Sequence, residues 1–169
     1  TNNGKLVLAR VDDTTFANVI GGTGSLETKG AGILTLSGNS NFDGAVTVSE
    51  GTLKLGHANA LGSKVGGTTV AAGATLDVFN KALGLEAVTI QGEGVLDTIS
   101  GLPVGALINT GAEQQNALRT LILAGNATVG GSGRFDVRTS ATEPATVTGN
   151  GYAITKVGTN QFSLVNAGD

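Results

Sequence analysis

The sequence contains no cysteine, methionine or tryptophan, and it has only two prolines and one histidine among its 169 residues. Without cysteine the chain can form neither a disulfide framework nor a cysteine-type zinc site. Charged residues make up 14% of the chain, against about 25% in a typical domain. The net charge is −3, no basic stripe is present and aromatic residues are only 4%, which argues against nucleic-acid binding.

Long hydrophobic runs are also missing. No apolar stretch approaches the ~20 residues that a transmembrane helix needs, so we expect this segment not to insert into a membrane. The chain is nevertheless 40% hydrophobic, with a mean hydropathy of +0.17, which distinguishes it from disordered sequences. It begins with Thr1 rather than methionine, and we therefore expect a processed or excised piece.

Glycine, by contrast, is abundant, with 28 residues in 169, more than twice the usual ~7%. Glycine and asparagine separate short segments in which apolar and polar side chains alternate, the pattern of half-buried strands. Comparable positions at Thr52, Thr75 and Val95 follow one another at intervals of 23 and 20 residues. A repeat of this length suits one coil of a β-solenoid.

A coil of about 20 residues cannot bury an apolar face alone, so successive coils must stack. We therefore predict an all-β chain, a parallel β-helix (β-solenoid) of about 7–8 coils. Residues 1–169 are expected to form a single segment of a longer repeat array. Residues 110–119 break the alternation and contain the one helix-friendly run, so we predict a loop or short helix that bulges from a corner there.

The most specific motif lies at residues 20–55. It reads Ile-Gly-Gly-Thr-Gly-Ser-Leu-Glu-Thr-Lys-Gly-Ala-Gly-Ile-Leu-Thr-Leu-Ser-Gly-Asn-Ser-Asn-Phe-Asp-Gly, then a Thr/Val strand, then Gly-Thr-Leu. This segment resembles the passenger-associated repeat of bacterial autotransporters, with Phe42 where tyrosine is more usual and with the lysine one position late. Residues 59–62, 72–77 and 131–138 are similar to stretches found in the same class of secreted repeat proteins.

The resemblance implies a right-handed parallel β-helix that is extracellular and displayed on a Gram-negative-type cell surface, or released from it. Such repeats act as stalks or adhesive surfaces, and the repeat itself carries no catalytic residues. We therefore predict a structural or adhesive module rather than an enzyme, without a cofactor. Its expected partners are neighbouring coils and, at the outer surface, a host or surface glycan or protein.

Two further functions stay open. One is a self-stacking subunit of an extracellular filament, because an uncapped β-helix end exposes unpaired strand edges that favour end-to-end self-association. The other is a polysaccharide-cleaving enzyme, which would need paired carboxylates beside a basic group in one cleft.

Five side chains are candidates for surface binding. Asp77 and Asp97 each follow an inward apolar residue and are expected on adjacent coils about 4.8 Å apart, as a weak cation site or part of a glycan-cleaving site. Arg119, Arg134 and Arg138 lie close in the sequence and are candidates for a basic patch that binds an anionic glycan. Ordinary solvent-facing variety is the alternative for both sets.

The single histidine, His57, carries no predicted chemistry. A metal site would need a second histidine or a cysteine, and a nucleophilic triad would have to use this residue as its base. We interpret it as a solvated loop residue. No metal ligand, cofactor-binding residue or catalytic residue is therefore predicted.

Overall fold

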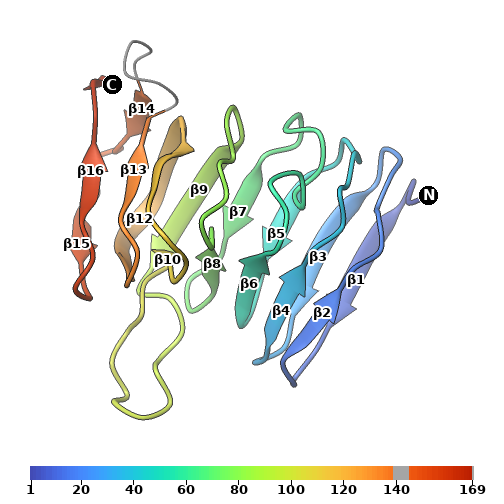
Figure 1. Ribbon diagram of the computed structural model, residues 1–169, viewed down its shortest axis with the longest axis horizontal. Coiled ribbons are helices and arrows are strands. Elements are labelled where there is room, and N and C mark those ends of the chain that lie inside the picture. The colour runs from blue at the N-terminus through green and yellow to red at the C-terminus, as the bar shows by residue number, and fades with distance from the viewer. Residues whose placement is uncertain (139–144, 169) are drawn as a thin grey trace.

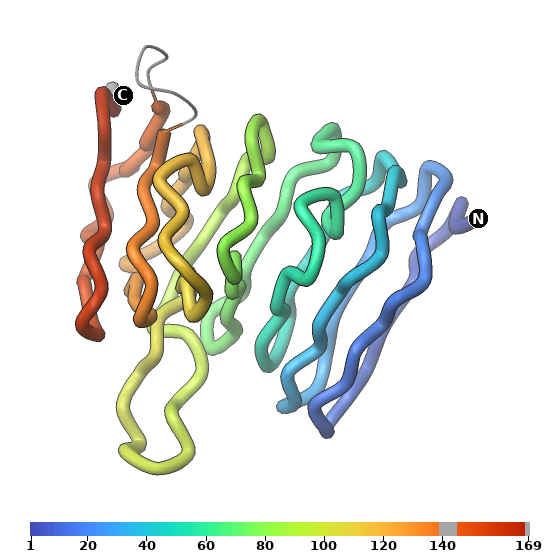
Figure 2. Tube along the Cα trace, in the orientation of Figure 1, coloured from blue at the N-terminus to red at the C-terminus, as the bar shows by residue number. Residues whose placement is uncertain are grey.

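In the computed structural model, which describes residues 1–138 and 145–168, short parallel strands stack into three rows along a solenoid (Figure 1). The described part of the chain winds through about six turns, and the two termini lie at opposite ends of the rod (Figure 2). The registers of the paired strands are parallel throughout the three rows. These observations confirm the predicted all-β parallel solenoid.

Each turn contributes one strand to a row, so that strands far apart in sequence become neighbours. The first row consists of β1 (Lys5–Ala9), β3 (Ser25–Lys29), β5 (Val46–Val48), β7 (Thr68–Val70), β9 (Ala87–Gly92), the first part of β12 (Thr120–Gly131), β14 (Ala145–Thr148) and β17 (Ala167–Gly168). The second row consists of β2 (Thr14–Phe16), β4 (Ile33–Leu36), β6 (Thr52–Leu55), β8 (Thr75–Asp77), β10 (Leu107–Asn109), the second part of β12, and β15 (Ile154–Lys156). The third row consists of β11 (Gln114–Leu118), β13 (Phe135–Val137) and β16 (Phe162–Leu164).

The in-register stacking places like residues above one another. In the second row, Leu34, Leu53, Leu76 and Leu107 are successive register partners, and each is at most 5% exposed. Because side chains alternate between the two faces of a strand, these leucines form one inward column. Burying each contributes about 1.5–3 kcal/mol to folding, so the column is a principal part of the core.

The turns are not equal in length, and this explains why the chain forms fewer coils than predicted. Lys5 pairs with Ser25, an interval of 20 residues, whereas Val88 pairs with Leu121, an interval of 33. The prediction of 7–8 coils assumed about 21 residues in every turn and was therefore slightly high. The additional residues form the third row and a protrusion between β9 and β10.

The structure of residues 110–119 differs from the loop or short helix predicted there. They form no helix, and the strand β11 occupies Gln114–Leu118 and pairs with β13. Ala117 and Leu118 are fully buried in the core. Stacking on a neighbouring turn therefore outweighs the weak helix preference of this composition.

The protrusion lies instead at residues 93–106, here named the arm. It forms the long loop between β9 and β10 that extends away from the rod (Figure 2). Val95, which its spacing aligned with Thr52 and Thr75, belongs to the arm, where the adjacent Leu96 makes an isolated antiparallel bridge with Pro103.

A buried asparagine joins three consecutive turns. Asn109 is fully buried, and its carbonyl oxygen accepts hydrogen bonds from the backbone N–H groups of Asn80 (2.9 Å) and Gly111 (3.0 Å). Its side-chain amide donates to the carbonyls of Ala112 (2.8 Å) and Arg134 (3.0 Å). These hydrogen bonds pair polar groups whose burial without a partner would destabilise the fold.

An ion-pair cluster stabilises the outer side of the first row. Glu27 is 8% exposed and lies 2.5 Å from the ammonium of Lys5 and 3.3 Å from that of Lys29, while the Ser49 hydroxyl donates to it at 2.7 Å. These contacts, with the Lys5 hydrogen bond the largest, lower the pKa of Glu27 to about 2. The carboxylate form is therefore favoured in the folded chain.

Truncating the inward column should destabilise the rod. Leu53→Ala is expected to lower the free energy of unfolding by about 2–5 kcal/mol, because it leaves a cavity among buried leucines. Urea denaturation measures the change. Val11→Ala is the control, since Val11 is 81% exposed and its loss should cost less than about 0.5 kcal/mol. Equal effects of the two substitutions would contradict the column.

The Glu27 cluster predicts a defined pH dependence. The folded pKa of about 2 is below the ordinary 4.5, so the stabilisation is complete above pH 4.5 and is lost as the pH falls toward 2. Glu27→Gln should therefore melt at a lower temperature than the parent chain at pH 7, and the difference should shrink as the pH falls from 4.5 to 2. A difference that stays constant over that range would rule out this ion-pair contribution.

Candidate binding surfaces

The arm is an ordered hairpin rather than an open loop. Three backbone hydrogen bonds of 2.9–3.0 Å join its two limbs: Gly105 N–H to the Glu93 carbonyl, Val104 N–H to the Val95 carbonyl, and Asp97 N–H to the Leu102 carbonyl. The arm therefore carries its own short ladder and presents its tip in a fixed position.

The base of the arm is anchored on β8. The buried Thr75 hydroxyl donates to the Gly105 carbonyl and accepts from the Val95 N–H, both at 2.9 Å. Gly94 has a φ of +79°, and a Cβ there would lie 2.1 Å from the Gly105 carbonyl oxygen. Only glycine fits this approach, so the sequence fixes where the arm leaves the rod.

The tip of the arm combines a tight turn with exposed apolar side chains. The Asp97 carboxylate accepts hydrogen bonds from the Ser100 N–H (2.7 Å), the Ser100 hydroxyl (2.8 Å) and the Ile99 N–H (3.1 Å). These bonds, the Ser100 backbone first, lower the pKa of Asp97. Leu96, Ile99 and Leu102 are 59%, 95% and 65% exposed, and adjacent exposed apolar side chains of this kind are typical of an interaction surface.

A groove of about 670 Å³ lies between the arm and the outward face of the second row. Its volume falls within the range of ligand sites, about 300–1,000 Å³. The wall on the rod includes residues from successive turns: Asp13, Ile33, Lys54, Asp77, Ile108 and Val157. The opposite wall is formed by arm residues, among them Leu96, Asp97 and Leu102.

Asp77 and Asp97 both line this groove, but they do not stack as predicted. Asp77 has Lys54 and Ile108 as its register partners, whereas Asp97 lies on the arm. The prediction of stacking was wrong because residues 93–106 are an insertion within a turn and not a strand of the next turn. The two carboxylates meet the same groove from opposite walls.

Asp77 is held firmly in place. It is 2% exposed and accepts hydrogen bonds from the N–H groups of Phe79 (2.9 Å) and Thr110 (3.0 Å) and from the Thr110 hydroxyl (2.5 Å). Phe79 has a φ of 40°, rare for an aromatic residue, and the Asp77 bond supports this conformation. The Lys54 ammonium lies 3.7 Å from the centre of the Phe79 ring, a cation–π contact that the sequence analysis missed.

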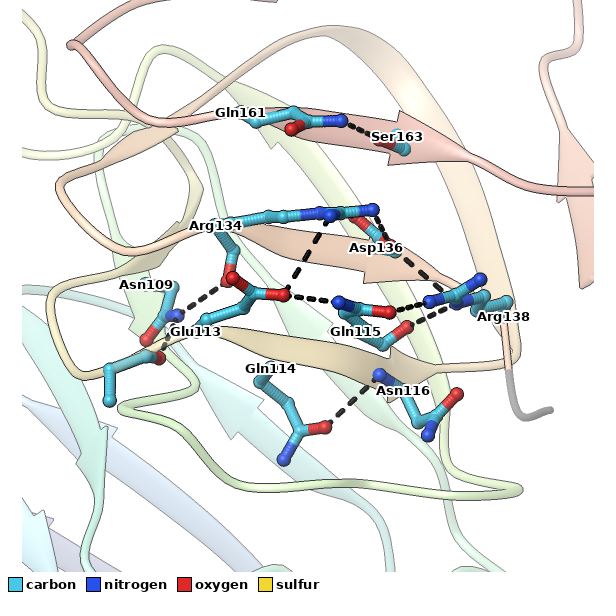
Figure 3. A network of polar contacts seen from close by, with 11 residues as sticks. Asn109, Glu113, Gln114, Gln115, Asn116, Arg134, Asp136, Arg138, Gln161 and Ser163 are labelled. Atoms are coloured by element: carbon cyan, nitrogen blue, oxygen red, sulfur yellow. Dashed lines mark hydrogen bonds and ion pairs between the residues drawn. The ribbon is translucent and has the colours of Figure 1, made fainter. Parts of the chain in front are cut away.

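The third row presents a polar network on its outer side (Figure 3). The Arg134 guanidinium donates to both oxygens of Asp136, at 3.0 and 2.8 Å, and the Arg138 guanidinium lies 3.5 Å from the same carboxylate. Asp136 is fully buried beneath these side chains. Gln115 bonds both Glu113 and Arg138, which extends the network onto β11.

The arginines singled out in the sequence are therefore not a uniformly basic patch. Arg134 and Arg138 share Asp136, and the Glu113 carboxylate is 3.7 Å from Arg134, so carboxylates offset the two positive charges. The Asp136 hydrogen bond, then the charges of Asp136 and Glu113, raise the pKa of Arg134. Arg119 lies at the corner between β11 and β12, where its backbone N–H donates to the Gly84 carbonyl. Anionic-glycan binding by these arginines stays a prediction.

Other chemistry-bearing features are sparse. His57 accepts a hydrogen bond from the Asn59 N–H at 3.0 Å, which gives it a local structural contact. Over residues 1–138 and 145–168, no group of three or more His, Cys, Asp and Glu is placed to hold a metal ion. Within the same ranges, no helix is long and apolar enough to cross a membrane.

The polar network of the third row can be tested by removing its central charge. Asp136→Asn should lower the melting temperature by about 4 °C or more, because it leaves two guanidinium groups facing each other without a carboxylate between them. Gln161→Ala, directly before the neighbouring strand β16, is the control and should change the melting temperature little. If thermal unfolding shows the same shift for both variants, Asp136 does not hold the network together.

Comparison with known proteins gives two matches. Residues 26–55 match the family described as the passenger-associated-transport-repeat. The chain is 33% identical over 111 residues to the adhesin BmaC autotransporter of Brucella suis biovar 1 (strain 1330). That match covers 66% of this chain but only 3% of the adhesin's length. No solved structure matches the chain significantly.

Proposed function

We propose that the chain is a structural and adhesive module of a bacterial surface protein, because residues 26–55 match the passenger-associated-transport-repeat and lie within a parallel solenoid. The repeat is the observation that carries the proposal, and the similarity to an autotransporter adhesin supports it. On this proposal the module is displayed outside a Gram-negative-type cell. It serves as part of a stalk and as a surface that binds.

The solenoid supplies the stalk. Each turn pairs its backbone with the next, and about six turns at ~4.8 Å per turn give a rod segment of about 29 Å. Stability in such arrays grows with the contacts between neighbouring turns, so adding turns lengthens the rod without a new fold. On this proposal the chain is one segment of a longer series of such turns.

The arm supplies the binding surface. Its hairpin is fixed on β8 through Thr75, and its tip exposes Leu96, Ile99 and Leu102. Neighbouring exposed apolar side chains of this kind often mark a surface that contacts a partner. We propose that the arm is the adhesive element of this segment.

The groove does not favour glycan cleavage. A glycosidase needs a carboxylic acid whose pKa is raised so that it can donate a proton. The pKa of Asp97 is lowered by the turn at Ser100, and both oxygens of Asp77 accept hydrogen bonds from Thr110. We therefore propose a non-enzymatic role.

An adhesion assay tests the proposal. Beads coated with the chain should bind to host cells or to immobilised extracellular proteins, and the triple substitution Leu96→Ser, Ile99→Ser and Leu102→Ser should reduce bead retention at least about tenfold, because arm side chains form the contact. The melting temperature should hardly change, since all three side chains are exposed.

The matched control removes three exposed apolar side chains outside the arm. Val11→Ser, Val19→Ser and Val65→Ser alter residues that are 81%, 62% and 77% exposed. Equal loss of binding in both triple variants, or none in the arm variant, would contradict the adhesive role of the arm.

A further inference from the structure

We propose that the groove beside the arm binds an extended polypeptide segment that carries both basic and apolar side chains. The inference rests on the adhesive function proposed above and names the partner class of that surface. Its basis is the length, charge and lining of the groove.

The length of the groove requires an extended ligand. The wall on the rod runs from Asp13 in the first turn to Val157 in the last, six ladder steps of ~4.8 Å, or about 29 Å. About eight or nine residues of extended chain, at ~3.3 Å each, span this distance. A ligand that follows the groove therefore crosses the turns and lies along the rod.

The charge of the groove favours a basic ligand. Asp13, Asp77 and Asp97 contribute three carboxylates to the lining, and Lys54 contributes one ammonium, which is engaged over the Phe79 ring. The Asp13 Oδ1 accepts a hydrogen bond from the Ile33 N–H, and the Asp97 Oδ1 accepts one from the Ser100 N–H. Their carboxylates can accept further charge-assisted bonds from lysine or arginine.

The apolar lining favours a ligand that also carries apolar side chains. Ile33 is 39% exposed on the rod, and Leu96 and Leu102 are 59% and 65% exposed on the arm, all within the groove. In an extended chain, successive side chains point to opposite sides. Since each wall of the groove carries both acidic and apolar groups, a segment that contains both basic and apolar side chains can meet both kinds of group on either side.

The arm also provides main-chain recognition. The bridge between Leu96 and Pro103 is flanked by the bonds from Asp97 to Leu102 and from Val104 to Val95, so it is a non-hydrogen-bonded pair. The N–H and carbonyl of Leu96 consequently point away from the Pro103 limb. Both groups are therefore available for hydrogen bonds with the main chain of a peptide that crosses the arm at this point.

Two other occupants fit less well. The arm of a second copy carries Glu93 and Asp97 and no lysine or arginine, so it would bring negative charge to a negative groove. An anionic glycan meets the same repulsion.

Binding of model peptides tests the inference on the full chain. The probe is a fluorescein-labelled peptide of four Lys-Val repeats, compared with one of four Glu-Val repeats by fluorescence anisotropy. The Lys-Val peptide should bind and the Glu-Val peptide should not. The double substitution Asp13→Asn and Asp97→Asn, which retains an acceptor oxygen at each site, should weaken binding about three- to tenfold. Raising the salt concentration should reduce this difference.

The control is Asp43→Asn, which removes an exposed carboxylate outside the groove and should leave the affinity unchanged. The inference is overturned if both peptides bind equally, if neither binds, or if Asp43→Asn weakens binding as much as the double substitution. Dimerisation in sedimentation experiments that is lost with the triple arm substitution would identify a second copy as the occupant instead. Arm-dependent adhesion of beads without peptide binding would reject this inference and leave the proposed function standing.

Discussion

The backbone ladder between successive turns is the constraint on which the rest of the structure depends. Each parallel pair fixes one residue of a turn above one residue of the turn before, as Leu53 is fixed above Leu34. Because side chains alternate with a period of two, a slip of one residue would exchange the core face with the solvent face. The buried leucines, the Glu27 ion pairs and the outward residues of the groove all require this register to hold.

Much of the fold could be predicted from the sequence, because most strands of the solenoid show a local alternation of apolar and polar residues. Alternation and glycine punctuation identify the strands of the early turns, and the resemblance of residues 20–55 to the passenger-associated repeat is confirmed by the family match over residues 26–55. The arm could not be predicted, because residues 95–98 show the same alternation as a strand of the solenoid, although they pair with residues 102–104 of the arm itself and not with the next turn. The strand β11 (Gln114–Leu118) was missed since its stability comes from the turns that cover it.

The candidate site was predicted in part, for reasons that differ between its members. Asp77 and Asp97 do line one groove, although an insertion and not stacking brings them there. Arg134 and Arg138 do lie together, but the buried carboxylate of Asp136 between them changes the electrostatics of the face. Such pairing depends on three-dimensional register, which the order of residues in the sequence does not reveal.

The hydrogen bonds at the base of the arm have a mechanical consequence. The arm leaves the rod and returns to it within one turn, and the Gly105 N–H bonds the Glu93 carbonyl where the two limbs meet. Tension applied along the rod passes from turn to turn through the strand ladder, and it reaches the arm only after this bond and the Thr75 anchor break. A partner held by the arm would therefore keep its contact geometry while the surrounding stalk carries a load.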